Sequence, residues 1–279
     1  MEKSILDSRK IPALAYSLLM YALGAGVAHY TGTIFNWLTA IVGLSWVFFL
    51  VFGALLLEQY FEKPGKTPAQ SPLLLLGIVF WTLVAVNTVS LLAMGQVTFS
   101  AWLLMTFAVL IALAYALPPL RWQARGYGEL TLALLLVGIT PALALLLNGG
   151  EWHRLLPMLT LPLAPLFLAS ELTLRLPTYS LEANAPKNLL QRLGWQLAFR
   201  IHHLLVMSSY LLIAIALLLG LPFTFGIAAL LTLPLGMLEI WYLDRIAEGI
   251  KPQWRALTIL AIALFSLTAY LLVFTLWTR

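Results

Sequence analysis

The chain alternates long apolar runs with short polar or turn-forming segments. A helix needs about 20 mainly apolar residues to cross the hydrocarbon core of a bilayer, and nine runs approach or exceed that length. Such runs are expected to be helical, because every backbone amide in lipid needs a hydrogen-bond partner within the protein. The predicted spans are residues 11–30, 34–57, 73–94, 99–117, 130–147, 155–169, 195–219, 224–242 and 256–277.

The composition agrees with this pattern. Apolar residues make up 62% of the chain and charged residues only 10%, against about 25% charged residues in soluble domains. The 279 residues contain no polar insert of domain size, so we expect a single membrane domain over residues 1–279. The expected fold class is all-α, a polytopic membrane bundle of nine transmembrane helices. Cys is absent, which excludes disulfides and thiolate metal sites.

The cationic residues indicate how the chain is oriented. If the amino terminus and every second loop face the cytoplasm, all 16 Lys and Arg residues except Arg154 and Arg279 lie on the cytoplasmic side. This predicts an integral protein of the plasma or inner membrane, with its amino terminus in the cytoplasm and its carboxyl terminus outside. The net charge of +5 then reflects orientation in the lipid bilayer, and no nucleic-acid partner is expected.

The acidic residues follow the same split, since all of them except Glu151 lie on or near the predicted cytoplasmic side. Carboxylates contribute little to membrane orientation. Their position therefore needs another cause, and a polar cavity that opens toward the cytoplasm would supply it.

The longest polar interruption of the apolar pattern is residues 170–194, SELTLRLPTYSLEANAPKNLLQRLG. Lipid cannot solvate such a segment, because an exposed amide or charge in hydrocarbon costs several kcal/mol. The segment is expected to lie in water or to line a protected polar cavity, and we take it as the centre of the functional site.

Two carboxylates follow the second apolar run. Glu58 and Glu62 are four residues apart and share one helical face. They could supply oxygen ligands for Mg²⁺, which favours one or two carboxylates plus substrate phosphate oxygens. The alternative is an interfacial helix end with solvated charges beside Lys63 and Lys66.

The polar loop after the fourth run contains Arg121 and Arg125. Guanidinium groups match phosphate oxygens in a bidentate manner, so these two residues could clamp a diphosphate. The alternative is that they only anchor the loop on the cytoplasmic side.

The sequence around these polar segments resembles the UbiA superfamily of intramembrane prenyltransferases. The residues that carry the resemblance are Tyr115-x-x-Pro-Pro-Leu-Arg121, Arg125-Gly-x-Gly-Glu-Leu130, and Leu176-Pro-x-Tyr179 continuing to Arg192-Leu-Gly194. The resemblance spans nearly the whole chain. It implies a UbiA-type helical bundle around a cavity that accepts an isoprenyl diphosphate and a hydrophobic acceptor.

The metal-binding motifs of that family are only partly present. An Asn-Asp-x-x-Asp-x-x-x-Asp stretch follows the second helix of the family, and an Asp-x-x-x-Asp stretch follows the sixth. The matching positions here are Glu58, Gln59, Glu62 and Lys66 in the first stretch, and Thr178 and Glu182 in the second. The resemblance thus implies catalytic and Mg²⁺-binding roles for Glu58, Glu62 and Glu182, with fewer anionic ligands than the family has.

The activity implied is transfer of an isoprenyl chain from its diphosphate to an aromatic or lipid acceptor. Basic residues would hold the diphosphate, and tyrosine rings would shield the allylic cation through their π faces. The substrate-binding residues predicted in this way are Tyr60, Lys66, Tyr115, Arg121, Arg125, Arg175, Tyr179 and Lys187.

The missing ligands favour a second hypothesis from another class. A catalytically silent protein of the same fold would bind a quinone, pigment or prenyl lipid, or serve as a structural subunit with a membrane-complex partner. His202 and His203 could ligate a pigment or haem, but adjacent side chains point about 100° apart on a helix, so packing is favoured. Glu239 is expected to reach the membrane interface beside Arg245.

Overall fold

The apolar runs fold into helices that satisfy their own backbone hydrogen bonds, as lipid requires. The computed structural model describes residues 10–62, 71–179, 190 and 193–279, and these residues contain helices and no strands. Nine helices of the described residues are long and apolar enough to cross a membrane. The predicted class, an all-α polytopic bundle, is confirmed.

Six of the nine spans are single α-helices that need no further division, and a seventh, α7, ends in one 3₁₀ turn (η5, Leu176–Thr178). These seven helices are α1 (Ile11–Tyr30), α2 (Trp37–Glu62), α3 (Pro72–Ala93), α4 (Phe99–Ala116), α7 (Leu155–Arg175), α9 (Trp195–Leu218) and α12 (Trp254–Trp277).

The two other spans are composite. The fifth joins η3 (Gln123–Tyr127), α5 (Gly128–Ala133), η4 (Leu134–Ile139) and α6 (Thr140–Leu147). η4 is π-helical, whereas η3 is kinked at Gly126, whose φ of 81° is not helical. The eighth joins α10 (Phe223–Leu230) and α11 (Leu233–Ala247) across a two-residue turn. π-Helical turns inside α-helices frequently occur at functional sites.

Four spans are longer at the same end of the molecule than the apolar pattern predicts. The second ends at Glu62 instead of residue 57, the fifth begins at Gln123 instead of residue 130, the sixth ends at Arg175 instead of residue 169, and the eighth ends at Ala247 instead of residue 242. The added turns carry charged residues, which an apolar pattern counts as loop. Two of these residues, Glu129 and Glu171, are buried inside the protein.

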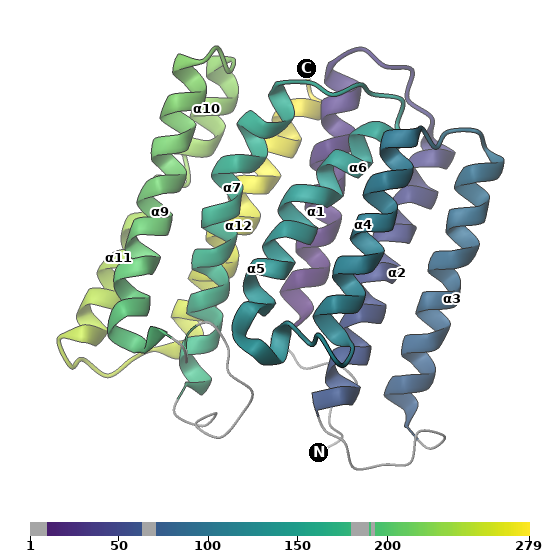
Figure 1. Ribbon diagram of the computed structural model, residues 1–279. Coiled ribbons are helices and arrows are strands. Elements are labelled where there is room, and N and C mark those ends of the chain that lie inside the picture. Colours follow the sequence, from purple (N-terminus) through teal and green to yellow (C-terminus); the bar gives the residue numbers. More distant parts are fainter. Residues whose placement is uncertain (1–9, 63–70, 180–189, 191–192) are drawn as a thin grey trace.

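The helices run nearly side by side, with α1, α6, α7 and α12 in the middle and α3 on one flank (Figure 1). α9, α10 and α11 form the opposite flank (Figure 1). α1 packs against both α6 and α12, and α7 packs against α9 and α12. α1 begins at the end of the bundle where α2 and α7 finish, which we call the inner end, and α12 finishes at the opposite, outer end (Figure 1).

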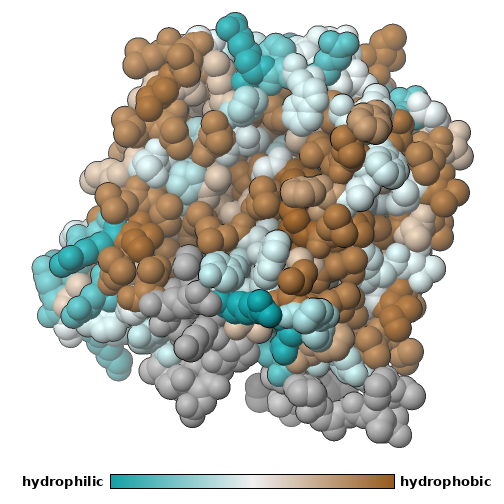
Figure 2. Space-filling model, viewed as in Figure 1, coloured by the Kyte–Doolittle hydropathy of each residue, from teal (hydrophilic) through white to brown (hydrophobic). Residues whose placement is uncertain are grey.

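The helices in the middle approach each other closely. A Cβ atom added at Gly24 of α1 would lie 1.9 Å from the carbonyl oxygen of Pro141 in α6, so only glycine permits this contact. At the outer end, the indole of Trp277 donates a hydrogen bond of 3.1 Å to the carbonyl of Ala22, which ties α12 to α1. On the face that Figure 2 shows, hydrophobic side chains cover much of the surface, and hydrophilic ones gather toward the two ends of the bundle.

Candidate functional site

The inner end of the bundle contains a buried ion pair between α1 and α2. Lys10, at the amino-terminal cap of α1, pairs through Nζ with Oε2 of Glu58 on α2. Glu58 is only 2% exposed, and a carboxylate this deeply buried needs a compensating charge. Among the residues that the structure describes, its other oxygen, Oε1, is buried without a hydrogen-bond partner.

A second group of charges lies between α5 and α7. The Nε atom of Arg175 is 2.6 Å from Oε1 of Glu129, and its Nη2 atom is 3.9 Å from Oε2 of Glu171. Glu129 and Glu171 are both buried. The 2.6 Å contact is an ion pair that is not aligned as a hydrogen bond, because the Nε–H does not point at the carboxylate oxygen.

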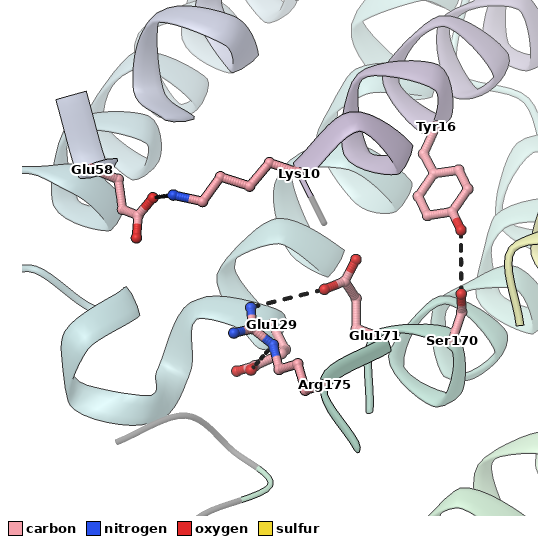
Figure 3. Close-up of polar contacts among 7 residues, drawn as sticks. All are labelled: Lys10, Tyr16, Glu58, Glu129, Ser170, Glu171 and Arg175. Carbon is pink, nitrogen blue, oxygen red and sulfur yellow. Dashed lines mark hydrogen bonds and ion pairs between the residues drawn. The ribbon is translucent and has the colours of Figure 1, made fainter. Parts of the chain in front are cut away.

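These two groups lie within electrostatic range of each other. The charge of Arg175 acts on Glu58, and the buried hydroxyl of Tyr115 on α4 experiences the charges of both groups. Figure 3 shows Lys10 and Glu58 pointing toward each other, and Glu129, Glu171 and Arg175 gathered together from different helices. We call this set the inner charge cluster: Lys10, Glu58, Tyr115, Glu129, Glu171 and Arg175.

An aromatic layer follows on the outer side of the cluster. The hydroxyls of Tyr16 and Ser170 are 3.2 Å apart (Figure 3), and Ser170 donates a hydrogen bond of 3.0 Å to the carbonyl of Ala261. The ring of Tyr16 packs edge-on against Phe265, with 4.5 Å between the ring centroids. The charged groups are therefore next to a well-packed apolar interior.

Comparison with known proteins identifies this architecture. No protein-family model and no curated protein sequence matches the chain. It is similar, however, to a solved UbiA homologue from Archaeoglobus fulgidus bound to GPP and Mg²⁺, with a TM-score of 0.60. The sequence identity is 18%, over 95% of this chain and 99% of that one. The chain has the UbiA fold.

Two further structures support the same assignment. An apo UbiA homologue from Aeropyrum pernix K1 is 14% identical over 98% of this chain and all of that one (100%), with a TM-score of 0.61. A structure described as digeranylgeranylglyceryl phosphate synthase in membranes is 14% identical over 97% of this chain and 98% of its own, with a TM-score of 0.63. The predicted UbiA-type fold is confirmed.

Two cations that we predicted to bind diphosphate contact backbone carbonyls of this UbiA fold. Nη2 of Arg121 donates a hydrogen bond of 3.0 Å to the carbonyl of Phe61, near the carboxyl end of α2. Helix ends leave such carbonyls without an intrahelical partner. Arg121 has a positive φ of 37°, which is strained for a residue other than glycine. Arg125 donates to the carbonyl of Pro119, inside its own loop, at 2.8 Å.

The other predicted residues fall into two sets. Tyr115 and Arg175 belong to the inner charge cluster, whereas Tyr60, Glu62 and Tyr179 are only half-buried at the inner ends of α2 and α7. The remaining predicted residues are Lys66, Glu182 and Lys187, which lie outside the described residues. Their roles stay predictions.

Three members of the inner charge cluster were not predicted as site residues: Lys10, Glu129 and Glu171. The sequence does contain a signal for the two carboxylates, since Glu171 is four residues before Arg175 and all acidic residues but one collect on one side. No local signal identifies Lys10 as the partner of Glu58, because 48 residues separate them.

A different pair is buried between α9 and α11. Nε2 of His202 is 3.2 Å from Oε1 of Glu239, and both side chains are almost fully buried. The expectation that Glu239 reaches the interface is therefore wrong: α11 directs it toward α9. Its neighbour His203 is 26% exposed and lies 3.7 Å from Asp244.

Magnesium binding can be judged from the oxygen atoms on offer. Among the described residues, no three His, Cys, Asp or Glu side chains gather into a metal site. The unpartnered Oε1 of Glu58 nevertheless fits the oxygen preference of Mg²⁺, and Glu62 is one turn further along α2. These two carboxylates could supply part of the coordination of one such ion.

Proposed function

We propose that this protein is a UbiA-type membrane prenyltransferase, which moves an isoprenyl chain from its diphosphate to an aromatic or lipid acceptor. The observation that carries the proposal is the location of the inner charge cluster in a fold shared, over nearly the whole chain, with a homologue bound to GPP and Mg²⁺. A homologue structure bound to DMAPP and Mg²⁺ adds a second isoprenyl diphosphate, at a TM-score of 0.53.

The charges of the cluster are suited to the first step of such a transfer. The bond between the allylic carbon and the diphosphate oxygen breaks, and its electron pair leaves with the diphosphate. Preorganised cations in a water-poor site stabilise the negative charge that develops there. In our proposal Arg175 and Lys10 supply positive potential, and their carboxylate partners hold them in place.

The second step is attack by the acceptor on the allylic carbon, with loss of a proton from the acceptor. Tyr115 is buried beside the cluster, where its ring can shield the cationic carbon. Tyr60 and Tyr179 would act in the same way from the ends of α2 and α7. The apolar interior next to the inner charge cluster would exclude water, which would otherwise capture the allylic cation.

Magnesium belongs to the same proposal. Glu58 and Glu62 would hold one ion together with Glu182, which lies outside the described residues. When bound, Mg²⁺ would offset negative charge on the diphosphate. In our proposal, the protein cations nearby supply positive charge that the family obtains from metal ions bound to its fuller set of aspartates.

One observation favours a second candidate function. Glu58 forms an ion pair with Lys10, and Arg175 forms ion pairs with Glu129 and Glu171. A cluster whose two cations are both paired with carboxylates can stabilise a fold without any reaction. The second candidate is a silent UbiA-fold protein that binds a quinone, pigment or prenyl lipid, or acts as a structural subunit of a membrane complex.

A radiolabelled transfer assay distinguishes the two candidates. Purified protein is incubated with geranylgeranyl diphosphate and a panel of hydroquinone, aromatic and lipid acceptors, with Mg²⁺ or with EDTA, and diphosphate release is measured. We expect release that depends on Mg²⁺. Glu62→Gln and Glu182→Gln should each lower the rate by about 100-fold, whereas Glu151→Gln at the outer end should leave it unchanged.

The same assay contains the result that would contradict transfer. Absence of diphosphate release with every acceptor, from a protein that still binds the labelled prenyl lipid, would contradict transfer and support the catalytically silent function. Equal rates for Glu62→Gln and Glu151→Gln would refute the role assigned to Glu62.

A further inference from the structure

A pocket lies on the far flank from α3, where the inner end of α11 meets the loop that leads into α12. It has a volume of about 270 Å³, and its lining includes Trp241, Tyr242, Arg245, Ile250, Lys251 and Gln253. Hydrophilic side chains gather at this lower corner of the molecule (Figure 2), below the labelled α11 of Figure 1. We call it the α11–α12 pocket, and it shares no residue with the inner charge cluster.

The pocket wall is positively charged. Arg245 and Lys251 line it, and no carboxylate does. Neither cation has an ion-pair partner within the part of the chain that the structure describes, because the nearby Asp244 faces His203 instead. Two cations in one concave site, with no carboxylate in its lining, favour an anion of matching size.

Neighbouring contacts fix the shape of this wall. The guanidinium carbon of Arg245 lies 4.9 Å from the ring centroid of Trp241, a cation–π contact that orients it. Across the pocket, the hydroxyl of Tyr242 donates a hydrogen bond of 3.3 Å to the amide oxygen of Gln253, which holds the loop against α11. The positive charge is therefore presented by a structured site.

An apolar strip leads away from the pocket along α11. Leu238, Trp241 and Arg245 are three and four residues apart, so they lie on one helical face. Leu238 is 43% exposed and Trp241 is 50% exposed. The order from membrane centre to inner end is apolar, aromatic, cationic, which is the order of polarity in a phospholipid.

We propose that the α11–α12 pocket binds the phosphate of an anionic phospholipid, with the acyl chains lying along Leu238 and Trp241. Basic pockets at the ends of transmembrane helices recognise such headgroups through charge. A free phosphate ion would use the two cations but would gain nothing from the apolar strip. The strip is the reason for choosing a lipid as the occupant.

Native mass spectrometry of the detergent-solubilised full chain tests this proposal. The protein is titrated with dioleoylphosphatidylglycerol, with dioleoylphosphatidylcholine, and with inorganic phosphate as competitor. We expect tighter binding of the anionic lipid, and no displacement by millimolar phosphate. Each neutralised cation should weaken binding about fivefold, so Arg245→Gln with Lys251→Gln should weaken it roughly 25-fold.

The matched control is Arg255→Gln. Arg255 is exposed in the first turn of α12 at the same end of the molecule, but it does not line the pocket. Circular dichroism checks that every variant is folded. Equal affinity for the two lipids, displacement by phosphate, or an equal loss in Arg255→Gln would each overturn the proposal.

Discussion

Individual residues at the inner end are held by charge balance. Glu58, Glu129 and Glu171 are buried carboxylates from three helices, and each faces Lys10 or Arg175. Removal of one partner from such a pair leaves an uncompensated charge, whereas replacement of both by apolar groups is often neutral. This difference between removing one partner and replacing both can be measured as a change in the free energy of unfolding.

Lys10→Met should lower the free energy of unfolding by about 3 kcal/mol, because it leaves Glu58 buried and unpaired. The double variant Lys10→Met with Glu58→Met should recover most of that loss. Thermal unfolding in detergent, followed by circular dichroism, measures both. A double variant less stable than the single one would show that the pair itself is a net source of stability.

Sequence reasoning located only part of this cluster. The four-residue spacing of Glu58 and Glu62 and the cation Arg175 were readable from local pattern. Lys10 was not, because its role depends on a contact between the first and second helices. Glu129 and Glu171 were recognised only as carboxylates on one side of the membrane, since pairing in three dimensions leaves no mark on a single sequence.

At the scale of elements, the spans follow from the apolar pattern, and their ends do not. Hydrophobic runs of this length locate helices because a helix satisfies all its backbone hydrogen bonds within one segment in lipid. The added turns of α2, the fifth span and α7 carry Glu58, Glu129 and Glu171, which are all buried inside the protein. Tertiary packing decides those ends, so the pattern could not.

The contact between α1 and α6 depends on a single missing side chain. Gly24→Ala would place a Cβ 1.9 Å from a backbone oxygen of α6, so the helices must separate, at a cost of about 3 kcal/mol. Gly138→Ala is the control, because its Cβ would meet Leu134 at an ordinary 3.6 Å. Unfolding midpoints in detergent compare the two, and equal midpoints would disprove the close contact.

The buried pair of His202 and Glu239 should stabilise the packing of α9 against α11. His202→Gln leaves Glu239 buried without its partner and should lower the free energy of unfolding by about 3 kcal/mol. His203→Gln on the same helix removes a partly exposed pair and should change stability by less than about 1 kcal/mol. If circular dichroism gives the two variants the same free energy of unfolding, the His202–Glu239 pair does not stabilise the packing of α9 against α11.

For the whole molecule, the described ends of α1 and α12 lie at opposite ends of the bundle (Figure 1), as an odd number of spans requires. Which end faces the cytoplasm is a prediction from the distribution of Lys and Arg. The domain assignment to residues 1–279 is likewise a prediction from length and composition. Fold class needed only hydropathy, but sidedness rests on charge and has to be measured in the membrane.

Cysteine labelling measures it directly, because the chain has no Cys of its own. Glu151→Cys and Glu248→Cys each replace an exposed glutamate, at the outer and inner ends respectively. In intact cells, a membrane-impermeant maleimide should label position 151 and spare position 248, and permeabilisation should expose both. The reverse labelling pattern would show that the orientation predicted from Lys and Arg is wrong.

The bond between Trp277 and the carbonyl of Ala22 also bears on biosynthesis. Helix α1 emerges from the ribosome well before α12, its neighbour in the folded protein, which follows more than 200 residues later. During translation, part of the α1 surface must meanwhile be covered by lipid, the insertion machinery or a chaperone. Insertion of α12, rather than of any early hairpin, is the event that completes the packing around α1.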